Sequence, residues 1–61
     1  MKIFGKYKST NKIVLVATGD RADKIATDIG KSGPISRKLL EGFDVLWWED
    51  EKGRRSNHLE A

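Results

Sequence analysis

Residues 45–60, VLWWEDEKGRRSNHLE, place two tryptophans side by side and follow them with acidic residues, paired arginines and the chain's only histidine. Neighbouring side chains of a β-strand point to opposite faces of the sheet, so Trp47 and Trp48 cannot both enter one core. Asp50 to Gly53 fit a type I turn with aspartate first and glycine last. The stretch therefore predicts a β-hairpin in which each tryptophan serves a different surface.

The register set by this turn sorts the hairpin into two surfaces. It pairs Asp50 with Arg54, Glu49 with Arg55, Trp48 with Ser56, Trp47 with Asn57, Leu46 with His58 and Val45 with Leu59. The first surface carries Phe43, Val45, Trp47 and Leu59, and the second carries Leu46, Trp48, Asp50, Arg54, Ser56 and His58. Because the first surface is continuously apolar, we expect it to face the core and make Trp47 the structural tryptophan. Trp48 is then open to a partner.

Residues 20–30, DRADKIATDIG, follow the period of an α-helix. The apolar residues fall at positions i, i+3, i+4 and i+7, and they are Ala22, Ile25, Ala26 and Ile29. Asp20 is a suitable N-cap, and Gly30 suits the left-handed position after the last turn. We predict a short helix over residues 20–29, which must lie against a sheet because its apolar stripe is small.

The N-terminal residues predict a second hairpin. Residues 2–8 (KIFGKYK) and 13–17 (IVLVA) have strand composition, and a polar turn at residues 9–11 separates them. The β-branched run of residues 13–17 is typical of a strand buried on both faces. The lysine-rich strand suits a sheet edge, where charge discourages pairing with another chain.

Residues 31–43, KSGPISRKLLEGF, leave two alternatives open. Ile35 and Leu39 belong to an alternating pattern that predicts a strand, which would join the final hairpin in an antiparallel meander. Alternatively, Pro34 opens a short helix that ends at Gly42. We favour the strand, because it gives residues 43–49 a neighbour on each side.

Length and composition bound the class of protein. Sixty-one residues make one small domain, and the absence of cysteine excludes a disulfide, a cysteine-type zinc site and a thiol nucleophile. The longest apolar run, residues 13–17, is too short to cross a bilayer, and the N-terminus lacks the features of a signal peptide. We expect a single cytoplasmic domain, residues 1–61, without membrane contact.

The charge distribution suggests a binding surface. The net charge is +3, and the first twelve residues carry four lysines and no acid. An indole flanked by cations can stack on an unpaired base while the cations contact phosphate, and tryptophan and arginine are also enriched at protein interfaces. The acidic residues 49–51 weigh against the nucleic acid and are compatible with a protein. The candidate binding residues are Trp48, Arg54, Arg55, Ser56, His58, Lys2, Lys6, Lys8 and Lys12.

Catalysis finds little support in the sequence. The segment DIGKSG, residues 28–33, lacks the first glycine of a phosphate-binding loop, because Ile25 occupies that position, and a helix precedes it where such a loop needs a strand. Ser56 and His58 lie two positions apart with no obvious orienting carboxylate. The consecutive residues 49–51 diverge and do not converge on a substrate or cation. We expect no enzymatic activity, no metal and no cofactor.

From Gly30 onward, the chain resembles the later strands of SH3-like small barrels of the KOW and Tudor type. The resemblance lies in a G-x-x-G-x-I opening, a glycine that leads into F-D-V-L-W, a turn that ends in glycine, and a closing R-R-S strand. It covers about half of the chain, and the predicted helix at residues 20–29 stands where such barrels have strand and loop. The resemblance implies binding of RNA, DNA or protein segments without catalysis.

We therefore expect an α+β fold with an N-terminal hairpin, one short helix and a C-terminal antiparallel meander, arranged as an open twisted sheet or a partly closed SH3-like barrel. The favoured function is a small nucleic-acid-binding regulatory protein. The alternative is a protein-binding regulator or inhibitor that docks on a larger host complex through the Trp48 face. A homodimer is a further possibility, because two strands are apolar on both faces and one helix covers one face.

Overall fold

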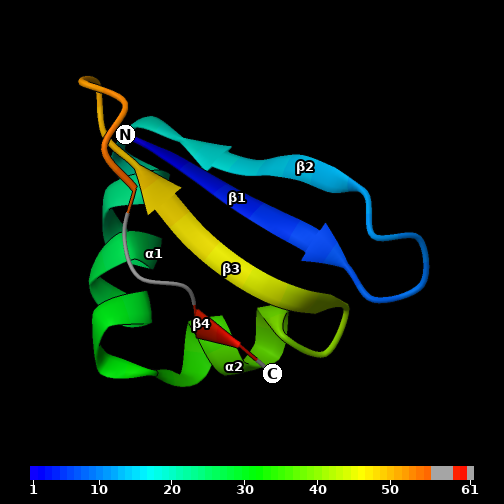
Figure 1. Cartoon of the computed structure of the whole chain (residues 1–61). Helices are drawn as coiled ribbons and strands as arrows, with labels where there is room; N and C mark the ends of the chain where they lie inside the picture. Colours follow the sequence, from blue (N-terminus) through cyan, green and yellow to red (C-terminus); the bar gives the residue numbers. More distant parts are fainter. Residues whose placement is uncertain (56–58, 61) are drawn as a thin grey trace.

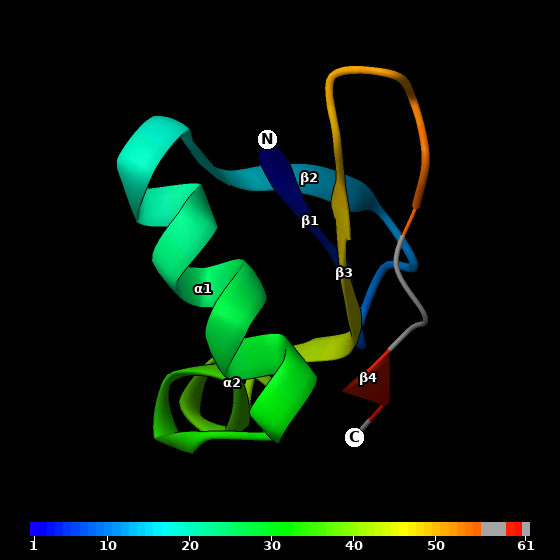
Figure 2. The ribbon, with the colours of Figure 1, turned by 90° about the vertical axis from the view of Figure 1, so that its left-hand side faces the viewer.

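The computed structural model describes residues 1–55, 59 and 60, and in these residues the chain forms four strands and two helices. In chain order they are β1 (Lys2–Tyr7), β2 (Ile13–Thr18), α1 (Gly19–Lys31), α2 (Pro34–Leu39), β3 (Phe43–Glu49) and β4 (Leu59–Glu60) (Figure 1). The strands form one antiparallel sheet in the order β2-β1-β3-β4. Both helices lie on one side of this sheet (Figure 2). The predicted α+β class is confirmed, whereas the barrel alternative is wrong because the sheet is open.

The predicted N-terminal hairpin is present, but its two strands have exchanged their expected places. β1 is central, between β2 and β3, and β2 forms an edge of the sheet. Ile13 and Leu15 of β2 are 57% and 52% exposed, while Ala17 is buried. The expectation of a β2 buried on both faces is therefore wrong. The helices cover only one side of the sheet, and the apolar run on the other side of β2 stays in water.

Helix α1 confirms the predicted helix and its buried stripe of Ala22, Ile25, Ala26 and Ile29. It extends two residues beyond the predicted end, so that Gly30 lies inside the helix. Ser32, with φ of 50°, takes the left-handed position that the sequence assigned to Gly30. The N-cap is Thr18, without a side-chain hydrogen bond, and Asp20 lies in the first turn. The helix thus ends with two backbone hydrogen bonds: the Ser32 N–H donates to the Ile29 carbonyl, and the Gly33 N–H donates to the Asp28 carbonyl.

The favoured strand at residues 34–41 is wrong, because residues 34–39 form helix α2. Pro34 is its first residue, as the alternative predicted. The Asp28 carboxylate of α1 accepts hydrogen bonds from the N–H groups of Ile35, at 3.3 Å, and Ser36, at 2.6 Å. These are first-turn donors that no earlier residue of α2 satisfies, so a side chain of the preceding helix stabilises this short one. The C-terminal strands consequently form a hairpin and not a three-stranded meander.

The turn between β3 and β4 has the predicted form. The Gly53 N–H donates to the Asp50 carbonyl at 3.0 Å, and Gly53 has φ of +79°. The predicted bridge between Glu49 and Arg55 is confirmed. Further along, however, Leu46 pairs with Leu59 and Val45 with Glu60, one residue later than predicted. The predicted pairs of Leu46 with His58 and of Val45 with Leu59 are therefore wrong.

The core lies between α1 and one face of the sheet. Its buried members are Ile3, Ala17, Ala22, Ile25, Ala26, Ile29 and Leu46, and Met1, Phe43, Trp48 and Leu59 are among the half-buried residues packed against them. Phe43 and Leu59 pack against the core, as predicted. The predicted core face is nevertheless wrong for residues 45–48, since Leu46 and Trp48 face the helices and Val45 and Trp47 do not. The pairing with β1 explains this. The sheet side that carries Lys2 and Lys6 must stay in water, and Val45 and Trp47 share that side.

Candidate functional site

Trp48 lies opposite Ile3 on the helix side of the sheet. It is half-buried against the core that α1 and the sheet enclose. The expectation that its ring stands on an open face together with Arg54 is wrong. Its role as a partner-binding residue stays a prediction, and it now concerns only the part of the ring that the core leaves uncovered.

The side of the sheet that faces away from the helices is called the outer face here. It is formed by Lys2, Phe4 and Lys6 of β1, Ile13 and Leu15 of β2, and Val45, Trp47 and Glu49 of β3, with Arg55 and Glu60 beside them. Cross-strand pairing arranges these side chains in rows. One row is Leu15, Phe4 and Trp47, and the next is Ile13, Lys6, Val45 and Glu60.

Trp47 is the centre of the outer face. Its ring stacks on Phe4 with centroids 5.9 Å apart and planes at 22°, and the Arg55 guanidinium lies 4.6 Å from its ring centroid. These neighbours help to leave only 4% of Trp47 exposed. Cation–π contact and aromatic stacking both stabilise such a cluster. The prediction that Trp47 is buried is confirmed, although it is buried on the side away from the helices.

Arg54 is engaged within the turn. Its Nε donates to Asp50 Oδ2 at 3.0 Å, and Asp50 Oδ1 accepts the N–H groups of Arg54 and Lys52, each at 2.9 Å. The backbone hydrogen bond from Arg54, and then its side chain and the Lys52 backbone, hold the pKa of the Asp50 carboxyl below its ordinary value. The Asp50 carboxylate therefore neutralises much of the Arg54 charge. We expect Arg54 to contribute little to phosphate binding.

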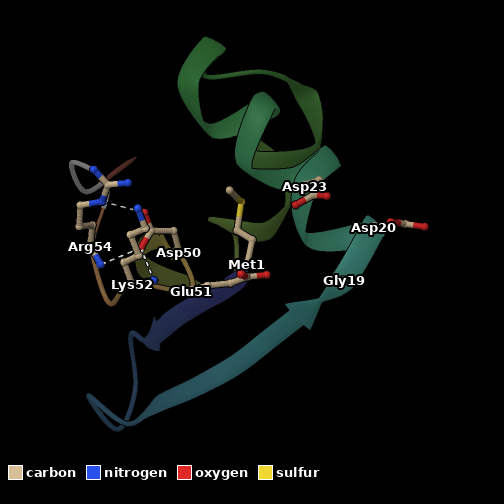
Figure 3. Close-up of a pocket in the computed structure, with 8 residues that line it drawn as sticks. All are labelled: Met1, Gly19, Asp20, Asp23, Asp50, Glu51, Lys52 and Arg54. Atoms are coloured by element: carbon tan, nitrogen blue, oxygen red, sulfur yellow. Dashed lines mark hydrogen bonds and ion pairs between the residues drawn. The ribbon is translucent and has the colours of Figure 1, made fainter.

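A shallow groove of about 440 Å³ separates this turn from the start of α1 (Figure 3). Asp20 and Asp23 line its helix side and Asp50 and Glu51 its turn side, with Met1 between the two sides. Figure 3 shows that these four carboxylates do not converge on one point. Among the residues that the structure describes, no group of three or more acidic, histidine or cysteine side chains is arranged to hold a metal ion.

The net positive charge of the molecule comes from the hairpin of β1 and β2. Residues 1–18 contain four lysines and no acid, whereas residues 19–61 contain eight basic and nine acidic residues. Lys2 lies opposite Glu49, and Lys6 lines a hollow together with Asp44 and Glu60. Lys8 and Lys12 are exposed at the far end of the hairpin, which projects beyond the helices (Figure 1). The two tip lysines are thus separated from the acidic groups that accompany the other two.

Two features of this hairpin escaped the sequence interpretation. Tyr7 is 40% exposed and stacks on Phe43, with centroids 4.7 Å apart and planes at 21°, next to the basic tip. Ile13 and Leu15 form an apolar strip on the edge strand. The alternation of Lys2, Phe4 and Lys6 was the available signal for the outer face, because it places two cations and an aromatic ring on one face of a strand. Ile13 and Leu15 lie on that face, opposite Lys6 and Phe4.

The structure brings together only part of the predicted site. Lys2, Lys6 and Arg55 share the outer face, Lys8 and Lys12 share the hairpin tip, and Arg54 lies in the turn. Ser56 and His58 lie outside the described residues. No helix in the described part of the chain is long and apolar enough to span a membrane. No protein-family model, curated protein or solved structure matches the chain.

Proposed function

We propose that this chain is a small, non-enzymatic, cytoplasmic module that binds nucleic acid through the β1–β2 hairpin. The observation that carries the proposal is the charge of that hairpin, with four lysines and no acid on an element that projects from the body of the molecule. A two-stranded ribbon fits the major groove of B-DNA, and lysines neutralise phosphates and release condensed counterions.

Within the hairpin, the main contacts are assigned to the tip. Lys8 and Lys12 are exposed and have no acidic neighbour in the adjoining sequence, residues 1–18. Lys2 and Lys6 contribute less, because Glu49 and the pair Asp44 and Glu60 lie beside them. Tyr7 adds a partly exposed ring at the base of the tip, a position from which it can contact a sugar or an unpaired base.

The test is a titration of fluorescently labelled single-stranded and duplex oligonucleotides at several salt concentrations. We expect the wild-type affinity to fall steeply with salt, and the double variant K8A/K12A to reduce the slope of log K against log salt by about 2, one for each lost phosphate contact. The matched control is K24A/K31A, which removes the same charge from exposed lysines of α1. Absence of binding at low salt, or equal loss in both double variants, would overturn the proposal.

A second candidate function is a regulator that binds a protein, and a different observation favours it. Ile13 and Leu15 are exposed aliphatic side chains on an edge strand, a combination that suits strand addition by a partner. The contact surface would then be β2 and the neighbouring part of the outer face. In that case Leu15→Lys abolishes partner capture, whereas K8A/K12A leaves it intact.

A further inference from the structure

We propose that a second copy of this chain pairs with the β2 edge, so that two four-stranded sheets join into one. β2 is the long open edge of the described sheet, since the opposite edge strand, β4, comprises only Leu59 and Glu60. No charged residue or proline occurs between Ile13 and Thr18, although edge strands of monomers commonly carry them against such pairing. The one irregularity of β2 lies at Val16 and leaves residues 13–15 regular. The inference goes beyond nucleic-acid binding and does not rest on it.

The sequence of β2 permits one self-complementary register. β2 has an irregularity at Val16, because Ile3 pairs with Ala17 and Phe4 with Leu15. Residues 13–15 precede it and alternate regularly, with Ile13 and Leu15 on the outer face. A two-fold axis at Val14 places Ile13 of each copy opposite Leu15 of the other on that face. Directly opposed aliphatic pairs stabilise antiparallel strands, and here the symmetry provides two of them.

The charges near the ends of β2 favour an antiparallel over a parallel arrangement of the two copies. Lys8 and Lys12 precede the strand, and Asp20 follows it in the first turn of α1. In the antiparallel pair, the basic end of each β2 lies beside the end of the other that leads into α1, where Asp20 and Arg21 balance each other. A parallel pair would instead bring the two basic ends together. The antiparallel arrangement therefore keeps the two basic ends apart and also forms the apolar pairs.

The helices leave room for this arrangement. α1 packs over the middle of the sheet, against β1, β2 and β3. In the joined sheet the two β1 strands are separated by three strand spacings, about 14 Å in all. Helices pack at about 8–10 Å, so the two copies of α1 pass each other on the same side without collision. The joined sheet then ends on both sides in the short β4.

The first experiment uses the absence of cysteine from the chain. In the proposed register, the Val14 positions of the two copies face each other across the axis, at a Cα separation of about 4.5–5.5 Å, which suits a disulfide. We expect Val14→Cys to form a disulfide-linked dimer under mild oxidation at least about tenfold faster than Ile35→Cys, a control on α2 at a position 48% exposed. Equal rates for the two variants would overturn the proposed pairing.

The second experiment measures solution mass by sedimentation between about 10 μM and 1 mM, the range of weak interfaces. We expect the mass to rise from the 6.9 kDa of one chain toward twice that value. Leu15→Lys should weaken this association about tenfold, because it sets charge into both apolar pairs, whereas Ile35→Lys, at a similarly exposed position, should leave it unchanged. A single-chain mass throughout the range, or equal effects of the two lysine variants, refutes the proposal. Both measurements are made without nucleic acid, so their outcome is independent of the oligonucleotide titration.

Discussion

Replacing Gly30 by alanine is expected to stabilise the protein, and the prediction separates the observed end of α1 from the one that the sequence indicated. Gly30 lies within the helix, and a Cβ added there meets no heavy atom within 4 Å. Glycine in a helix interior costs about 0.8–1.0 kcal/mol relative to alanine. Because Gly30 is the penultimate helical residue, we expect a gain of about 0.5–1 kcal/mol. For a domain of this size, that gain raises the Tm by about 2–8 °C.

The assay is thermal unfolding followed by circular dichroism, together with urea unfolding at 25 °C. Gly19→Ala is the matched control, because a Cβ at Gly19 also meets nothing within 4 Å but the backbone there has φ of +66°. That variant should lose about 1 kcal/mol from left-handed strain. If Gly30 were the left-handed residue after the helix, Gly30→Ala would lower the Tm as Gly19→Ala does. A Tm below wild type for Gly30→Ala therefore contradicts the assigned helix end.

Two further changes probe the sheet and the junction of the helices. Gly5→Ala should lower the free energy of unfolding in urea by about 1–3 kcal/mol, because its Cβ would lie 2.6 Å from the Phe43 ring. A double variant with Phe43→Leu should recover part of the loss. A loss that the second substitution leaves unchanged contradicts the contact. The Ser36 side chain, and then the Ser36 and Ile35 N–H groups, hold the pKa of Asp28 below its ordinary value. The ionised Asp28 carboxylate therefore stabilises the fold at pH values above the ordinary pKa. This stabilisation is lost as the pH falls through the lowered pKa. The urea midpoint of Asp28→Asn should consequently fall less than that of wild type between about pH 5 and pH 2, and parallel curves for the two proteins would contradict this role.

The sequence predicted those elements whose signals are local. The stripe of α1 and the turn at Asp50 to Gly53 are both determined within a few residues, by helical spacing in one case and by aspartate and glycine chemistry in the other. Helix α2 was mistaken for a strand because its first-turn partner, Asp28, lies six residues before Pro34 on another helix. Six residues with alternating apolar positions fit either structure, and only the packed arrangement supplies the missing acceptor.

The sequence predicted that the two tryptophans lie on opposite sides of the sheet, but it assigned the wrong side to the core. Alternation correctly separated Trp47 from Trp48, but it could not say which side the helices would cover. That choice depends on the pairing of β3 with β1, where Lys2 and Lys6 hold their side of the sheet in water. The pairing joins residues 36 to 47 positions apart, and hairpin rules for adjacent strands do not contain it. Reading the lysine alternation of β1 as a constraint on β3 would have oriented the sheet.

Along one row of the outer face, the exposed fraction of the side chains rises from β3 to the open edge at β2. Trp47 on β3 is 4% exposed, Phe4 on β1 is half-buried, and Leu15 on β2 is 52% exposed. The gradient follows from connectivity, because the chain continues past β3 to place Arg55 on Trp47, whereas β2 leads directly into α1 on the opposite side. Sixty-one residues supply one helical layer, and the rest of the cover on the outer side comes from stacked rings and a guanidinium. The aliphatic residues left uncovered are therefore those farthest from β3, on the strand whose edge is also open. A copy added at that edge would pair the strand and cover Ile13 and Leu15, which the described residues leave 57% and 52% exposed.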